Sequence, residues 1–379
     1  MTRPALTLPV FLVALALTPA LHAERLMDSM DALTSAWSAT QTQWTRGDFK
    51  DLLPNAQKAV QLAQDRFGPL HPSVVPYFNN LAVVDETLAL YPEAESNFRW
   101  GLALGEKALG PNDPSLADSL VPLARLLDQL GRFEEAGLTL QRALALQKAG
   151  GEKSAPEEAQ ALELAADIQA HQGSLDPAVE DLKQALALPG ISSLPLEAGL
   201  LTHLGKLESA QKDWKDAETH LQKALALNQK NNVPGSITIA DSLQALADFY
   251  QLSGDPVKAR DFAAKALDLD LHFIGPEDTY ANIPYHQRGA EAYGALGRWK
   301  DAQGLYQRIL AIKTQVYGPL HPEVALTLEN LADTSLKLGE EDAARKDLGQ
   351  ALLILRKYFA PDHPLIRDAQ KRLSSLTQP

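Results

Sequence analysis

The sequence contains no cysteine among its 379 residues, and only 6% of them are aromatic. The absence of thiols excludes disulfide bonds, thiolate zinc sites, iron–sulfur clusters and a cysteine nucleophile. Basic residues are outnumbered, 35 against 48 acidic ones, and the resulting net charge of −13 argues against a broad nucleic-acid surface. Hydrophobic residues make up 45% of the whole sequence, a share typical of a folded globular protein.

The first 23 residues differ in pattern from the rest of the chain. Arg3 precedes an apolar stretch at residues 8–17, and Ala23 places a small residue at the end of the segment. This pattern predicts a secretory signal peptide over residues 1–23, with an uncleaved N-terminal anchor as the alternative. A run of ten apolar residues is too short for a stable membrane span, and no later run is long enough. We therefore expect an exported protein, periplasmic if the source is a Gram-negative bacterium and secreted otherwise.

A repeat of about 42 residues fills most of the chain. Its recurrence is marked by eight residues, called anchors here, at intervals of 39 to 43 residues: Phe49, Tyr91, Phe133, Leu175, Trp214, Pro256, Trp299 and Glu341. Small residues keep register three and ten places after the anchors and nine places before them, and alanine fills seven of the eight places three after. Small residues on two helices let their backbones approach closely. Because one such hairpin cannot bury its apolar faces alone, the pattern predicts an all-α stack of hairpins.

The junctions between repeats share glycine and proline. Residues 68–72, 110–114 and 318–322 all have the pattern Gly-Pro-x-x-Pro, in which glycine ends one helix and the second proline begins the next. At two junctions, Asp113 and Asp278 are expected to cap the following helix through their side chains.

The small-residue columns resemble the tetratricopeptide repeat, lengthened from its usual length of about 34 residues. The run from Gly318 to Ala332 resembles the kinesin-light-chain subtype in particular. The resemblance implies a right-handed superhelical solenoid of about eight helix-turn-helix repeats. The expected division is a solenoid over residues 24–366, with repeats at 30–73, 74–116, 117–157, 158–195, 196–237, 238–279, 280–324 and 325–366, and a C-terminal capping helix over 367–379.

The sequence carries no catalytic or cofactor motif that the surrounding residues support. It lacks the phosphate-binding, dinucleotide-binding, zinc-protease and nucleophile-elbow motifs. Ser209 and Lys212 match a Ser-x-x-Lys pair but have no companion motif. His71, His321 and His363 occupy equivalent junctions, so stacking separates them and they are interpreted as turn residues rather than metal ligands. We predict a protein that is not an enzyme and needs no metal or cofactor.

The resemblance also implies where a partner binds. In tetratricopeptide superhelices the first helix of each hairpin lines the concave face, through positions three and two before the small residue and one after it. We call these positions −3, −2 and +1. The predicted contact residues for a protein or peptide are Asn79, Asn80, Arg125, His203, Lys206, Gln244, Arg288, Glu291 and Asn330.

Two modes of partner binding stay open. An acidic partner would use the cations Arg125, Lys206 and Arg288, whereas a partner read through its backbone would use the asparagines. In kinesin light chains the asparagine at position −2 contacts the peptide backbone, and only Asn80 and Asn330 match it.

Three classes of function compete for this sequence. The leading hypothesis is an exported, non-enzymatic scaffold that binds a peptide or protein segment on the concave face. The alternatives are an enzyme with an unrecognised site on that face, and a structural spacer or self-assembling array. A nucleic-acid partner and an integral membrane span after leader removal are not expected.

Overall fold

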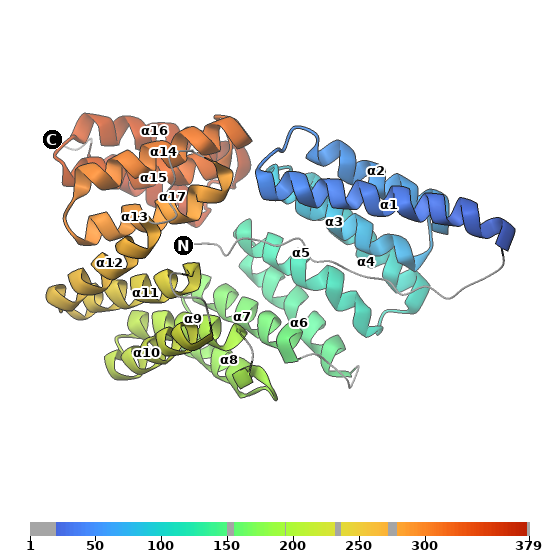
Figure 1. Ribbon diagram of the computed structural model, residues 1–379, viewed down its shortest axis with the longest axis horizontal. Helices are drawn as coiled ribbons and strands as arrows, with labels where there is room; N and C mark the ends of the chain where they lie inside the picture. Colours follow the sequence, from blue (N-terminus) through green and yellow to red (C-terminus); the bar gives the residue numbers. More distant parts are fainter. Residues whose placement is uncertain (1–19, 150–154, 194, 232–235, 272–278, 377–379) are drawn as a thin grey trace. The chain divides into compact units, whose positions relative to one another are not determined.

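The computed structural model describes residues 20–149, 155–193, 195–231, 236–271 and 279–376, with side chains from Leu33 onward (Figure 1). These residues form seventeen α-helices and four short 3-10 helices, and they contain no strand. The predicted all-α class is therefore confirmed. Contacts divide the chain into two compact units, Met1–Glu152 and Lys153–Pro379, which we call unit 1 and unit 2.

Unit 1 contains three helical hairpins. Their helices are α1 (Ala20–Arg46) with α2 (Leu52–Phe67), α3 (Val75–Thr87) with α4 (Tyr91–Leu109), and α5 (Ala117–Gln129) with α6 (Phe133–Ala149). Short 3-10 turns at Pro72–Val74 and Pro114–Leu116 lead into α3 and α5.

Unit 2 contains five hairpins and a final helix. Their helices are α7 (Ala155–His171) with α8 (Leu175–Ala187), α9 (Leu196–Gln211) with α10 (Trp214–Asn231), α11 (Ile237–Ser253) with α12 (Pro256–Leu271), α13 (Ile283–Ala295) with α14 (Trp299–Tyr317), α15 (Pro322–Lys337) with α16 (Glu341–Tyr358), and the single helix α17 (Pro364–Ser375). The remaining 3-10 turns are Ile191–Ser193 and Tyr280–Asn282.

The anchors mark where the second helix of each hairpin begins. Seven of the eight are the first residue of that helix, and the exception, Phe49, lies three residues before α2. A glycine such as Gly131 (φ 76°) or Gly297 (φ 73°) turns the chain just before the anchor. Because most residues avoid a left-handed backbone, glycine at this place stops the first helix sharply.

The small-residue columns lie where the two helices of a hairpin touch. Ala136, Ala178 and Ala259 are all fully buried. The helices approach closely at Gly205 on α9, where a Cβ atom would lie 2.6 Å from Cγ of Leu221 on α10. A hairpin interface this tight explains why the repeat keeps alanine or glycine at these positions.

First helices of neighbouring hairpins also contact one another directly. These contacts join α3 with α5 in unit 1, and α7 with α9, α9 with α11 and α11 with α13 in unit 2. Among the described residues, no comparable contact joins the second helices of neighbouring hairpins. Because elements on the inside of a bend lie closer together than those outside, each of these stacks bends toward its first helices.

Side chains at the junctions cap the helices that follow. Asp113 accepts a hydrogen bond from the backbone N–H of Ser115 (3.0 Å), as predicted. His71, His321 and His363 each accept through Nδ1 from the backbone N–H two residues on, at 3.2, 3.2 and 3.3 Å. Their turn role is confirmed, and each ring serves as an acceptor that the sequence analysis did not specify. Asp278 lies outside the described residues.

The predicted signal peptide falls mostly outside the described residues, which begin at Ala20. Helix α1 begins there, four residues before the expected mature start at Glu24. Within the described part of the chain, no helix combines the length and the hydrophobicity needed to cross a membrane.

Candidate protein-interaction face

The side chains at positions −3, −2 and +1 of the first helices form what we call the first-helix face. In unit 1 one of its amides, Asn79, is committed to a contact between hairpins. Asn79 on α3 donates through Nδ2 to Ser119 Oγ on α5 (2.9 Å), and Ser119 Oγ bonds to Asn79 Oδ1 (3.1 Å). Asn79 is only 3% exposed. Its polar atoms therefore join two hairpins, and a role in binding a partner stays a prediction.

Arg125 on α5 faces an acid of the preceding hairpin. Its Nη2 atom lies 3.6 Å from Oε2 of Glu86 on α3, a distance longer than a direct hydrogen bond. The Arg125 side chain is 36% exposed, whereas that of Glu86 is 6% exposed. The pair leaves part of the guanidinium open to solvent.

In unit 2, His203 on α9 lies between two carboxylates of α7. Its Nδ1 atom is 3.3 Å from Glu163 Oε1, and its Nε2 atom is 3.2 Å from Asp167 Oδ1. Burial by itself lowers the pKa of this imidazole, but hydrogen bonds and charge attraction from both carboxylates outweigh it and raise the pKa to about 9. His203 is therefore a cation at neutral pH whose charge is matched within the chain.

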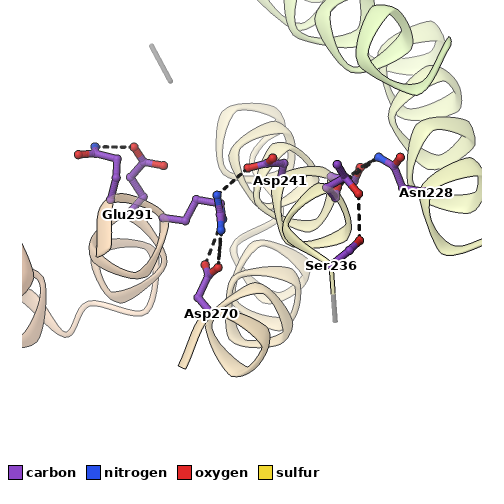
Figure 2. Close-up of polar contacts among 9 residues, drawn as sticks. Asn228, Ser236, Asp241, Asp270 and Glu291 are labelled. Atoms are coloured by element: carbon purple, nitrogen blue, oxygen red, sulfur yellow. Dashed lines mark hydrogen bonds and ion pairs between the residues drawn. The ribbon is translucent and has the colours of Figure 1, made fainter. Parts of the chain in front are cut away.

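Arg288 on α13 is also matched within the chain. Its Nη2 atom donates to Asp270 Oδ1 on α12 at 2.6 Å, and its Nη1 atom donates to Asp241 Oδ1 on α11 at 3.0 Å. Figure 2 shows these two carboxylates on either side of the guanidinium. Arg288 is 3% exposed and Asp270 is 1% exposed, and burial raises the pKa of Asp270 to about 6 although Arg288 lowers it. The sequence predicts that this cation contacts a partner, and its burial counts against that role.

A common rule joins these ion pairs. His203 and Arg288 each bond to acids of the hairpin before their own, Arg125 lies 3.6 Å from one, and Arg372 on α17 follows the same rule. Arg372 lies nine residues after the junction residue His363, just as Asn330, at position −2, lies nine residues after His321, so Arg372 corresponds to position −2. It bonds to Asp333 Oδ1 on α15 and donates to the backbone oxygen of Glu329 (3.2 Å). Arg372 thus binds the acidic face of α15 as His203 binds that of α7.

Two glutamines hold carboxylates on the same face. Gln244 donates through Nε2 to Asp248 Oδ1 (2.8 Å) on α11, and Gln287 donates to Glu291 Oε1 (2.8 Å) on α13. Both pairs join position −3 to position +1 of one helix, a spacing that places the two side chains on neighbouring turns. Burial raises the pKa of Asp248 and of Glu291, and the charge of Asp248 raises that of Glu291 further.

The other predicted contact residues have fewer partners. Lys206 is exposed, and no ion pair joins it to another described residue. The half-buried Asn330 side chain likewise has no hydrogen bond within the described residues, and Asn80 is 5% exposed with its Oδ1 atom unpartnered. Lys206 and Asn330 are thus placed where a bound segment could reach them, and their role in binding stays a prediction.

Glu329, at position −3 of α15, was not among the predicted contact residues. It is 8% exposed, and its Oε1 atom has no hydrogen-bond partner. Burial raises its pKa to about 7, an effect that Arg372 opposes and that Asp368 and Asp333 reinforce. The sequence feature that could have indicated Glu329 is Asp333, four residues later, because two acids at this spacing on a helix repel each other.

The structure gives no support to catalysis at the Ser209–Lys212 pair. Ser209 is 5% exposed and donates its hydroxyl hydrogen to the backbone oxygen of Gly205 (2.6 Å), whereas Lys212 ends α9 in a left-handed conformation. Within the described residues, no group of three or more histidine, aspartate and glutamate side chains is arranged to hold a metal ion.

The chain belongs to the tetratricopeptide repeat family. The sequence matches that family over residues 121–192, 196–271 and 285–352, which together make up more than half of the chain. Tetratricopeptide repeats generally bind proteins or peptides, so the class of the protein is that of a protein-interaction scaffold. Among curated proteins no significant match was found.

Solved structures share the fold at low sequence identity. The apo form of the quorum sensor NprR from B. thuringiensis aligns over 88% of this chain and 92% of its own, with 13% identity and a TM-score of 0.55. A tetratricopeptide repeat protein from Parabacteroides merdae aligns over 80% of this chain and 99% of its own, with 15% identity and a TM-score of 0.48. Repeats from a putative kinesin light chain of Podosopora anserina cover 54% and 98%, with 20% identity and a TM-score of 0.41.

Proposed function

We propose that this protein is an exported, non-enzymatic scaffold that binds an extended protein segment along the first-helix face of unit 2. The observation that carries the proposal is the direct contact of α7 with α9, α9 with α11 and α11 with α13. These contacts bend the stack toward its first helices, and a face on the inside of a bend surrounds an extended segment. Lys206, Gln244, Glu291 and Asn330 supply polar groups of several kinds along it.

The proposal that the scaffold is non-enzymatic rests on how its reactive groups are used. Asp248 and Glu291 each accept a hydrogen bond from a glutamine, His203 is held between two carboxylates, and the Ser209 hydroxyl donates to a backbone oxygen. A general base acting on a serine needs the two side chains within hydrogen-bond reach. These contacts favour a binding role for the face over a catalytic one.

The proposed export rests on the pattern of residues 1–23 alone. Expression of the full chain in a Gram-negative host, followed by fractionation and N-terminal sequencing, tests it. We expect a periplasmic product that begins near Glu24. A cytoplasmic or membrane-bound product that retains Met1 would contradict this part of the proposal.

The absence of cysteine offers a direct test of the binding face. Peptides of random sequence are first selected on the purified protein from a display library. Cysteine is then introduced singly at Lys206 or Asn330 on the face, or at the exposed Lys215 or Gln350 on second helices, and each variant is labelled with a bulky maleimide.

We expect labels at positions 206 and 330 to abolish binding of the selected peptides, and labels at 215 and 350 to leave it unchanged. Selection of no peptide, or the opposite pattern of blocking, would refute the proposed face. Sedimentation of the unlabelled protein tests the self-assembling alternative. Turnover of a bound peptide, lost on a single substitution, would instead support an enzyme.

A further inference from the structure

The carboxylates Asp248 and Glu291 occupy the same position on consecutive first helices of unit 2. Each is oriented by a glutamine one turn earlier, at 2.8 Å in both cases. Figure 2 shows the Glu291 carboxylate accepting this hydrogen bond, separate from the contacts that Asp241 and Asp270 make. Two oriented carboxylates one hairpin apart present acceptors to any cation that reaches the face.

The chain itself shows what such positions accept. The equivalent acid on α7, Asp167, binds the imidazole of His203, and the equivalent acid on α15, Asp333, binds the guanidinium of Arg372. In both places the cation comes from position −2 of the next first helix.

Within the described residues, neither Asp248 nor Glu291 forms an ion pair with such a cation. The residue that should reach Asp248 is Arg288, but its guanidinium is held by Asp270 and Asp241 instead. The residue that should reach Glu291 is Asn330, which is neutral. These two acids therefore occupy the same position as Asp167 and Asp333, but no ion pair joins either of them to a cation of the described residues.

The glutamine that binds Asp248 also has a buried amide oxygen. Gln244 is 5% exposed, its Nε2 atom is committed to Asp248, and its Oε1 atom has no hydrogen-bond partner. A buried carbonyl oxygen is normally satisfied by a donor, so this atom indicates that a donor is missing from the face.

We propose that Asp248, Glu291 and the Gln244 amide oxygen form a subsite for a basic side chain, arginine or lysine, of the bound protein segment. This inference rests on the function proposed above and adds the chemistry of the partner. An arginine fits best because its planar guanidinium offers five N–H donors to carboxylate and amide oxygens together.

The charges around the subsite favour a basic partner over an acidic one. His203, Arg288 and Arg372 are each paired within the chain, whereas Lys206 forms no ion pair within the described residues. The charge of Lys206 lowers the pKa of both Asp248 and Glu291, so it acts on both carboxylates. Lys206 therefore competes with a ligand cation instead of assisting it.

The probe is an end-blocked, dye-labelled 11-residue peptide in which arginine alternates with alanine. Matched peptides carry citrulline, an uncharged analogue, or glutamate in place of arginine. Fluorescence anisotropy in low salt measures binding to the parent protein and to the double variant Asp248→Asn/Glu291→Gln. The control, Asp261→Asn/Asp342→Asn, makes the same change in net charge at exposed acids of α12 and α16.

We expect the arginine peptide to bind more tightly than both matched peptides, and the double variant to weaken it by about tenfold while the control changes it less than about twofold. Lys206→Ala is expected to strengthen binding, whereas Lys215→Ala leaves it unchanged. Equal affinity of the three peptides, an unaffected double variant that retains its helical circular dichroism, or weaker binding to Lys206→Ala would each overturn the inference. Should the double variant unfold, the Lys206→Ala comparison still decides.

The two proposals fail in different ways. If the selected peptides are blocked by labels on the face but carry no basic residue, the subsite is wrong and the scaffold function stands. If labels on the face block no peptide, the scaffold function as proposed is wrong.

Discussion

The two units of this chain use the same hairpin but treat their first-helix faces differently. In unit 1 an amide and a hydroxyl, Asn79 and Ser119, bond to each other across two hairpins, and Arg125 makes one long contact with Glu86. In unit 2 the same positions carry acids, held by glutamines or by cations of the next hairpin. The comparison teaches that the small residues define the scaffold, whereas the polar positions beside them vary between contacts within one helix and contacts between hairpins.

The largest expected effect separates the arginines of the two units. Arg288→Ala should destabilise the protein by about 3–5 kcal/mol, because it leaves the buried Asp270 carboxylate without its partner. Arg125→Ala, which removes a half-exposed and distant partner of Glu86, should cost less than about 1 kcal/mol. Urea denaturation of both variants measures the difference. Equal losses would show that the two faces are not built as differently as described.

The next effect concerns how closely the hairpins pack. The column that holds alanine at 82 and 124 in unit 1 holds glycine at 205 in unit 2. Gly205→Ala should cost about 1–3 kcal/mol, because its Cβ would meet the Leu221 side chain at 2.6 Å. Gly199→Ala on the same helix meets nothing within 4 Å and should stabilise by about 0.5–1 kcal/mol. Thermal melting should move in opposite directions for the two variants.

The third effect is a dependence on pH that only unit 2 should show at this position. His203 has a folded pKa of about 9, above its unfolded value of about 6.5, so its stabilisation is complete below pH 6.5 and is lost as the pH rises through 9. The contribution is of the order of 1–3 kcal/mol. His203→Asn, which installs the residue found at position 80, should flatten the loss of stability between pH 7 and 10. An unchanged slope in denaturation series would contradict this.

The smallest effect tests the junctions. Asp113→Ala removes a side-chain cap and should cost about 1 kcal/mol, whereas Asn112→Ala in the same turn should cost almost nothing. At the corresponding junction of unit 2, His321→Ala should cost a similar amount at neutral pH. Urea denaturation of the three variants measures these costs, and equal losses for Asp113→Ala and Asn112→Ala would contradict the capping role.

The scaffold could be predicted from the sequence because it depends on local and repeated features. Anchors such as Tyr91 and Trp299 follow a turn glycine, and a helix must begin where the previous one has stopped. Buried columns such as Ala136 and Ala259 mark a contact that every hairpin repeats. A wrong alignment of one repeat would have removed the small residue from its column, so eight aligned repeats fix the positions of the helices.

The polar partners could not be predicted in the same way. Arg288 bonds to Asp270, eighteen residues earlier, and to Asp241, forty-seven residues earlier. Which of several nearby acids a long side chain reaches depends on the angle between hairpins and on rotamers, and neither repeats in the sequence. The sequence therefore placed Arg288 on the correct helix while leaving its orientation open. The unpartnered oxygen of Gln244 is likewise visible only once the helices are packed.

The cations that bond to the preceding hairpin give the array a direction. His203, Arg288 and Arg372 all bond to acids that come earlier in the chain, and Arg125 faces one. Shortening the chain from its C-terminal end therefore exposes acids that have lost their partners, beginning with Asp333 when α17 is removed. Gene duplication that adds a hairpin internally faces the same asymmetry, because the inserted copy must bring a cation suited to the acids already present. Adding or removing a hairpin therefore changes which acids of the neighbouring hairpin have a cation to pair with.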